Sequence, residues 1–77
     1  MTLKLEKQTL YLSGQLSVED AEALLAELLE GRALAVDLQA LEHLHCANLQ
    51  VLMAAKPRIS AWPGDADFTQ WLQAALA

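Results

Sequence analysis

Two short segments near the start of the chain alternate apolar and polar side chains. Residues 3–6 and 9–13 both place leucine at every second position, between charged or hydroxyl-bearing residues. A period of two with one apolar face predicts two half-buried strands. Residues 6–8 form the predicted turn between these strands, and Gly14 is expected to end the second one.

After Ser17 the apolar period changes to that of a helix. Glutamates occupy the other face of residues 18–30, which is typical of a solvated helix surface. Ser17 is a favourable N-cap, Asp20 can complete a capping box, and Gly31 supplies the stop at the C-terminal end. The apolar stripe of this helix consists of Val18, Ala21, Leu24, Leu25, Leu28 and Leu29.

A strand, a helix and another strand are predicted next. Residues 33–36 form a continuous apolar run that ends at Asp37, as in a central strand covered on both faces. A short helix over residues 47–56 stops before Pro57. Residues 59–62 are brief and apolar, and we expect them to form the last strand.

A turn at residues 63–64 precedes one more helix, which Asp65 or Asp67 is expected to cap. Trp62 and Trp71 are interpreted as core residues under this helix. An exposed patch formed by Trp62, Trp71 or Leu76 would mark an interface. The apolar stripe of the helix consists of Phe68, Trp71, Leu72, Ala75 and Leu76.

The predicted order of elements is strand, strand, helix, strand, helix, strand, helix. Strands separated by helices favour parallel pairing with right-handed crossovers. We therefore predict an α/β fold in which a small mixed sheet of about four strands packs against three helices. The chain has 77 residues, which is room for a single domain over residues 1–77.

Composition and charge narrow the classes of function. Hydrophobic residues make up 55% of the chain and charged residues 19%, which indicates a globular domain and not a disordered segment. The net charge is −5 and the five basic residues are scattered, so we expect no nucleic-acid binding and no attraction to an anionic membrane surface. No run approaches the roughly 20 apolar residues of a membrane span. The single Cys46 excludes an intramolecular disulfide and, with no signal-peptide pattern at the N-terminus, favours a cytoplasmic location.

Two segments carry a recognisable pattern. Residues 12–17 read Leu-Ser-Gly-Gln-Leu-Ser, and residues 36–52 read VDLQALEHLHCANLQVL. The first resembles the strand end before the first helix of the STAS family (anti-sigma-factor antagonists). The second resembles the segment of that family that holds a phosphorylated serine or threonine. Together with the helix between them they cover residues 12–56, and the order of elements extends the resemblance over nearly the whole chain. The resemblance implies a single, short STAS-like domain that is not an enzyme.

Cys46 occupies the phosphorylation position of that family. His45 stands where the resemblance places an aspartate and Asn48 where it places a glycine, whereas Asp37 matches the family's aspartate. A hydroxyl at a helix N-terminus can carry a phosphate near free backbone N–H groups, but a thiol is not a substrate for a Ser/Thr kinase. The resemblance therefore implies a pseudo-phosphosite with no phosphorylation switch.

The resemblance also implies a partner-binding surface, formed by the loop after the second strand and the start of the Cys46 helix. The expected partner is a kinase-like, anti-sigma or chemosensory protein of bacterial signal transduction. The alternative within the family is an accessory subunit of a lipid-transport ABC complex, which would bind the ATPase subunit. No cofactor is expected, and we expect a monomer or a weak homodimer. The candidate surface residues are Ser13, Gly14, Gln15, Ser17, Asp37, Gln39, His45, Cys46, Ala47, Asn48 and Leu49.

The run His43-Leu44-His45-Cys46 suggests a function of another class. His43 and His45 would share one face of an extended strand, which favours a metal site where a further ligand is near. Cys46 at a helix N-terminus beside His45 has the setting of a reactive or redox-sensing thiol. The simpler interpretation is a small, half-buried thiol that packs against its neighbours, and we favour it and expect no bound metal. The candidate further ligands are Glu42, Asp37 and Asp65.

Overall fold

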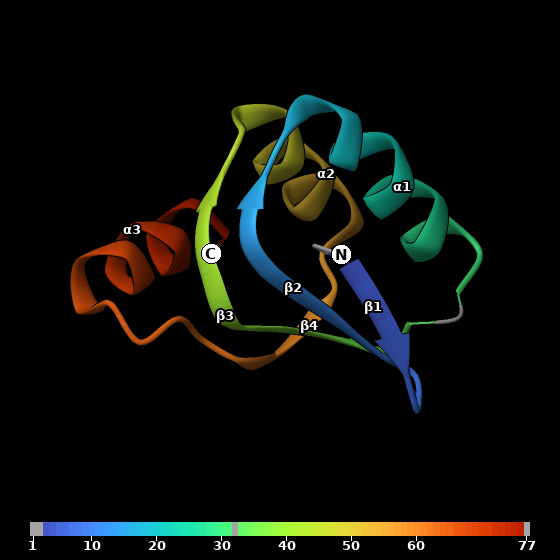
Figure 1. The fold of residues 1–77 in the computed structure, drawn as a ribbon, viewed down its shortest axis with the longest axis horizontal. Coiled ribbons are helices and arrows are strands. Elements are labelled where there is room, and N and C mark those ends of the chain that lie inside the picture. Colours follow the sequence, from blue (N-terminus) through green and yellow to red (C-terminus); the bar gives the residue numbers. More distant parts are fainter. Residues whose placement is uncertain (1–2, 32, 77) are drawn as a thin grey trace.

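The computed structural model describes residues 3–31 and 33–76. The predicted order of elements and the predicted fold class are confirmed, with a mixed four-stranded sheet and three helices (Figure 1). In chain order the elements are β1 (Leu3–Glu6), β2 (Thr9–Leu16), α1 (Val18–Leu29), β3 (Ala35–Leu44), α2 (Cys46–Ala55), β4 (Arg58–Ala61) and α3 (Ala66–Leu76).

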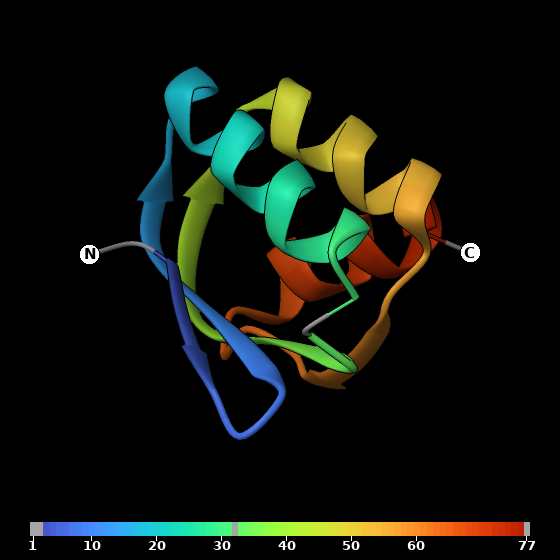
Figure 2. The same cartoon turned by 90° about the vertical axis from the view of Figure 1, so that its right-hand side faces the viewer.

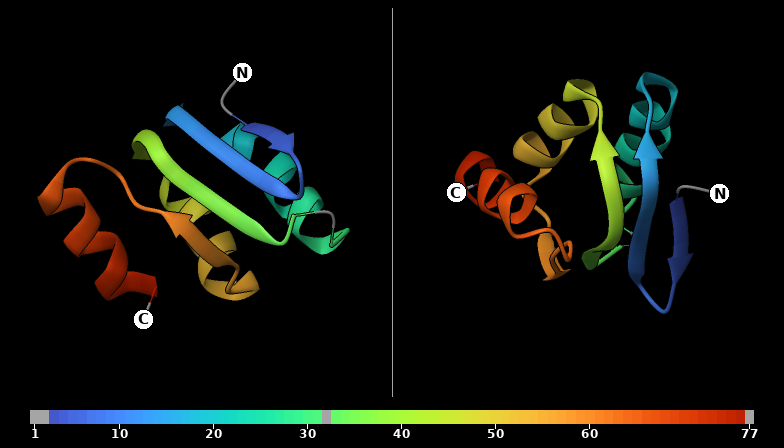
Figure 3. Two further views of the ribbon diagram at one scale, coloured as in Figure 1. Left: turned by 90° about the horizontal axis from the view of Figure 1, so that it is seen from below. Right: turned by 60° about the vertical axis from the view of Figure 1, so that its left-hand side comes forward.

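The sheet has the strand order β1-β2-β3-β4. β1 pairs antiparallel with β2, whereas β2–β3 and β3–β4 are parallel pairs. α1 and α2 are the two crossover helices, and they lie side by side over one face of the sheet (Figure 2). α3 contacts α2 and lies beyond the end of the short strand β4, beside the second half of β3 (Figure 3). None of the helices within residues 3–31 and 33–76 is long and apolar enough to span a bilayer.

The hairpin between β1 and β2 turns on two residues, Lys7 and Gln8. Both have positive φ angles, 50° and 68°, which is the backbone of a type I′ turn and matches the twist of the flanking strands. Glu6 pairs with Thr9 and so belongs to the strand. The turn is therefore one residue shorter than the predicted turn.

β2 does not end at Gly14, as the sequence predicted, but continues to Leu16. Gly14 has a φ of +67°, a conformation that side-chain-bearing residues rarely adopt, and the pairing with β3 shifts between Gly14 and Gln15. Leu16 is buried in the core. The glycine thus bends the strand without ending it, because the pairing and the burial of Leu16 continue beyond it.

β3 does not end at Asp37 either. It runs to Leu44, and its three buried leucines, Leu38, Leu41 and Leu44, are spaced by three residues. Two register shifts against β2 explain this spacing, because each inserts one extra residue into β3 while β2 keeps its period. A spacing of three hides the period of two by which strands are recognised, so the pattern alone missed this half of the strand.

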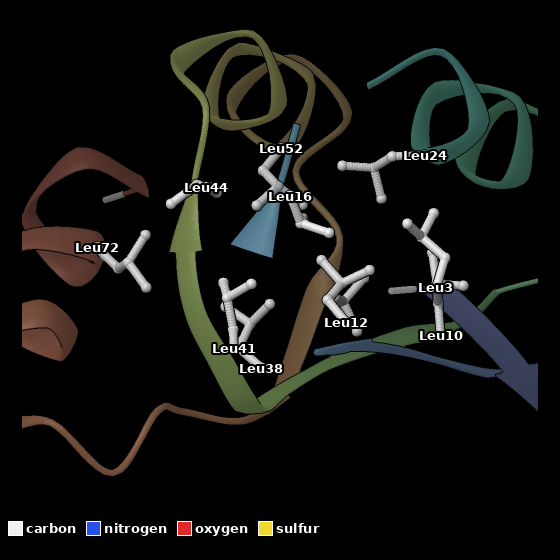
Figure 4. Packing of buried hydrophobic residues seen from close by; sticks show 11 residues of the cluster. Leu3, Leu10, Leu12, Leu16, Leu24, Leu38, Leu41, Leu44, Leu52 and Leu72 are labelled. Carbon is white, nitrogen blue, oxygen red and sulfur yellow. The ribbon is translucent and has the colours of Figure 1, made fainter. Parts of the chain in front are cut away.

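The core between the sheet and the helices is almost entirely leucine (Figure 4). Trp62 is half-buried against it, but the side chain of Trp71 is 52% exposed and stacks on Phe68 with ring centroids 6.3 Å apart. The interpretation of both tryptophans as core residues is therefore wrong for Trp71. The buried cluster consists of Leu3, Leu10, Leu12, Leu16, Leu24, Val36, Leu38, Leu41, Leu44, Leu52 and Leu72.

The predicted apolar stripe of α1 is only partly buried. Ala21 and Leu24 face the core, whereas Val18, Leu25 and Leu29 are exposed. These three exposed residues recur at positions i, i+7 and i+11, so they lie along one line of the helix surface, which we call the α1 stripe. A twelve-residue helix on the edge of a small sheet presents less contact area than its apolar residues could cover, and the excess faces outward.

Two matched substitutions in α1 test this burial pattern. Leu24→Ala is expected to lower the free energy of unfolding by about 2–5 kcal/mol, because it removes a fully buried side chain from the core. Leu29→Ala makes the same chemical change at a position that is 74% exposed and should alter it by less than about 0.5 kcal/mol. Urea unfolding followed by circular dichroism measures both. Equal losses would contradict the described packing of α1.

Candidate functional site

The ends of the parallel strands β2 and β3 meet at one corner of the molecule. Gln15 pairs with His43 and Leu16 with Leu44, so α1 and α2 start next to each other. The His45 N–H donates to the carbonyl oxygen of Leu16 at 2.9 Å and continues the strand contact into the loops. We call residues 13–17 and 45–49 together the corner surface.

Asn48 holds the two halves of the corner surface together. Its side chain is fully buried, and its Nδ2 donates to the carbonyl oxygen of Ser17 at 2.8 Å. Its Oδ1 is buried as well and accepts no hydrogen bond from any described residue. Burial of this unpaired amide oxygen lowers the stability of the fold. The hydrogen bond from Nδ2 to Ser17 is therefore made at a cost in folding free energy. The contact links the first turn of α2 to the cap of α1, across 31 residues of sequence.

Ser17 and Asp20 form the predicted capping arrangement at the start of α1. The Ser17 N–H donates to Asp20 Oδ2 at 2.8 Å, and the Ser17 hydroxyl lies 3.1 Å from the same oxygen. The Asp20 N–H donates back to the Ser17 carbonyl oxygen at 3.1 Å. The hydroxyl of Ser17 therefore serves the helix cap, although its side chain lies at the surface.

His45 caps α2. Its Nδ1 accepts a hydrogen bond from the Ala47 N–H at 3.1 Å, which satisfies one of the free amides of the first turn. Where the resemblance places an aspartate, a common N-cap residue, this chain has an imidazole that performs the same capping role. Since Nδ1 uses its lone pair in this bond, the proton of the neutral ring is on Nε2.

Cys46 is exposed, so the interpretation of a packed, half-buried thiol is wrong. Its Sγ lies 3.8 Å from His45 Nδ1. Sulfur can hydrogen-bond at that distance, but Nδ1 already accepts from the Ala47 N–H. The pair therefore lacks the geometry in which His45 would take the thiol proton.

The structure does not assemble a metal site around the two histidines. His43 is on β3 and His45 is in the cap, and no group of three or more His, Cys, Asp or Glu side chains within the described ranges is placed to hold a metal ion. Asp65, one proposed further ligand, instead caps α3 by accepting from the Phe68 N–H at 3.0 Å.

Asp37 and Gln39 lie on β3 next to the first residue of the corner surface, because Ser13 pairs with Ala40. Asp37 is opposite Tyr11, two residues before Ser13 and four residues before Gln15, the latter about 13 Å at the rise of a strand. Its Oδ1 accepts from the Gln39 N–H at 2.9 Å, at the first register shift of β3. Asp37 therefore stabilises a strand irregularity, and the two residues lie beside Ser13 and not at the loops where α1 and α2 start.

The α1 stripe is the feature of this region that the sequence pattern did not identify. Val18 is 52% exposed and directly follows Ser17, so the stripe begins at the corner surface and runs along α1. Exposed Glu19 and Glu22 lie beside it, and no basic residue stands in α1. The sequence did contain a signal for this stripe. α1 has more apolar residues than one buried face of a twelve-residue helix requires, so some of them had to be exposed.

Comparison with known proteins adds no relative. No family model matches the chain, and neither the curated proteins nor the solved structures give a match.

Asn48→Ala is expected to lower the free energy of unfolding by about 1–3 kcal/mol, because the tie to Ser17 is lost. It should also speed hydrogen exchange of the His45 amide, which bonds across the same corner. Ser17→Ala is the control. It leaves the backbone acceptor of Asn48 in place and should cost only about 1 kcal/mol through the cap. Unchanged protection of the His45 amide in Asn48→Ala would show that the tie does not hold the corner together.

The cap of α2 gives a second test. His45→Ala should lower the free energy of unfolding by about 0.5–2 kcal/mol, because the acceptor for the Ala47 N–H is lost. His45→Asn restores a side-chain oxygen at the N-cap and should recover most of that loss. Thermal and urea unfolding measure both variants. If Asn and Ala at this position were equally destabilising, capping would not be the role of His45.

Proposed function

We propose that this protein is a non-catalytic interaction module of the STAS type in bacterial signal transduction. It binds a kinase-like, anti-sigma or chemosensory partner through the corner surface. Cys46 takes the place of the phosphorylated residue, so binding is not switched by phosphorylation there. The site of action is the cytoplasm.

One observation carries the proposal. The two segments that resemble STAS motifs, residues 12–17 and 36–52, come together at one corner and are tied by the Asn48–Ser17 and His45–Leu16 hydrogen bonds. A surface held by buried contacts is pre-organised, which lowers the entropy cost of binding a partner. The Ser17 hydroxyl and His45 Nδ1 are both used in helix caps, which suits docking better than chemistry.

The charges beside the corner surface indicate the chemistry of the partner. Glu19 and Glu22 border the α1 stripe, and the chain as a whole carries a net charge of −5. A partner with an apolar patch and a basic rim would complement both features. Val18 lies where the corner surface and the stripe meet, so we expect it to be central to the contact.

The accessory subunit of a lipid-transport ABC complex is the second candidate. Its supporting observation is the α1 stripe, with Leu25 at 39% and Leu29 at 74% exposure. Permanent interfaces are more apolar than transient ones, so a large apolar surface favours a subunit that stays bound to its partner. The two candidates share the binding surface and differ in the identity of the protein bound.

Cross-linking from Cys46 tests the proposal, because Cys46 is the only cysteine and is exposed. The protein is labelled there with a photoreactive maleimide and irradiated in an extract of its native host. The expected product joins it to a kinase-like, anti-sigma or chemosensory protein, whereas a product with an ABC ATPase would select the second candidate. Val18→Asp should reduce the yield at least severalfold, because it places a charge in the apolar contact.

The matched control moves the label to α3, outside the corner surface. A Cys46→Ser, Gln70→Cys variant carries the same probe on an exposed position of α3 and should give no such product. Equal products from both positions, or products with neither class of partner, would refute the proposal. A thiol or metal function would instead appear as zinc bound by the unlabelled protein and lost in Cys46→Ser.

A further inference from the structure

A cavity of about 430 Å³ opens between the end of α2, β4 and α3. Its inner surface is apolar and includes the fully buried Leu52 together with the half-buried Ile59, Trp62 and Leu76. Two polar side chains complete the lining, Lys56 and Gln73, and both are exposed. We call it the α2–α3 cavity, and its volume lies in the range of small-molecule sites.

The cavity follows from the unequal lengths of the strands. β4 pairs only with residues 35–37 at the start of β3, so the second half of β3 has no strand on that side in the described part of the chain. α3 takes that place, with Leu72 extending from it toward β3 (Figure 4). A helix packs against β3 at a greater distance than a hydrogen-bonded neighbouring strand would. The space between α3, β4 and α2 is therefore left open.

Lys56 supplies the only cationic group in the wall of this cavity. It follows the last residue of α2 with φ 50° and ψ 52°, and its N–H donates to the Leu52 carbonyl oxygen at 2.9 Å. The one ion pair between described residues joins Lys4 and Glu6, so no described carboxylate neutralises Lys56 within 4 Å. A residue in the left-handed conformation is usually glycine, and here a long cation stands in its place.

We propose that the α2–α3 cavity binds a small carboxylate with an apolar body. The apolar wall accepts the hydrocarbon part, the Lys56 ammonium pairs with the carboxylate at the mouth, and the Gln73 amide can donate a further hydrogen bond. A neutral or cationic ligand would leave the ammonium unpaired or repelled. The charge of the cavity therefore selects for an anionic head group.

This inference does not depend on the proposed function. The corner surface is at the N-terminal end of α2 and Lys56 is at its C-terminal end, about 15 Å apart along a ten-residue helix. A ligand in the cavity would leave the corner surface free for a protein partner. Failure of the cross-linking experiment and failure of ligand binding would therefore be separate results.

Octanoate and octan-1-ol are the probes, because they share an alkyl chain and differ in the charged head group. Both are titrated into a Trp71→Phe variant, in which Trp62 is the remaining tryptophan and reports directly on the cavity. Saturable quenching or enhancement by octanoate is expected, with weaker binding of hexanoate by about three- to fourfold per lost methylene. Shifts of backbone amide signals should cluster at residues 52–62 and 73–76.

Three variants locate the interaction. Lys56→Gln should weaken octanoate about two- to fivefold and leave octan-1-ol unchanged, because only the carboxylate uses the ammonium. Lys7→Gln removes the same charge at the β1–β2 turn and should change neither. Gln73→Phe fills the mouth from an exposed position and should weaken both probes at least tenfold. Circular dichroism confirms that each variant is folded.

The inference is overturned by any of three results. Octanoate could cause no saturable change in Trp62 fluorescence, or Lys56→Gln and Lys7→Gln could weaken it equally, which would make the effect one of net charge alone. Amide shifts centred on Leu3, Leu5 and Leu10 would place the ligand in the apolar groove between β1 and α1 instead.

Discussion

The parallel pairing of β2 with β3 determines how the rest of the molecule is arranged. These are the two longest strands, and their ladder runs from Thr9 and Ala35 to Leu16 and Leu44. Parallel strands end at the same edge of a sheet, so the helices that follow them must start side by side. The corner surface, the contact between α1 and α2 and the core beneath them all follow from this pairing.

The register shifts of β3 allow the strand to pair with β2 along its whole length and still bury its leucines in the core. Each shift adds one residue to β3 while β2 continues, and the added residues keep Leu38, Leu41 and Leu44 on the core side. The Asp37 carboxylate stabilises the first shift through the Gln39 amide. A regular strand with leucines three apart would turn every second one of them to the other face.

The three departures from the STAS pattern form a consistent set in this structure. His45 retains a cap for α2, Asn48 replaces a small residue with a tie to the α1 cap, and Cys46 remains exposed between them. Together they favour a corner surface that is held in one conformation over one that is switched by phosphorylation. This physical consistency supports the proposed docking role, while α2 carries a second, chemically different feature at its other end.

The sequence by itself determined the order of the elements and the caps of α1 and α3. The leucine alternation, the Ser17–Asp20 box, Gly31 and Asp65 are local signals, and each acts within a few residues of chain. The segments of the corner surface were also predictable, since they lie at element ends. Tertiary structure alone decided the lengths of β2 and β3, because strand length depends on the partner strand and not on the local period. It also decided that Asn48 reaches Ser17, that Asp37 lies beside Ser13 and not at the helix starts, and that α3 leaves a cavity beside Lys56. These are contacts between residues distant in sequence, and no local pattern encodes the distance between them.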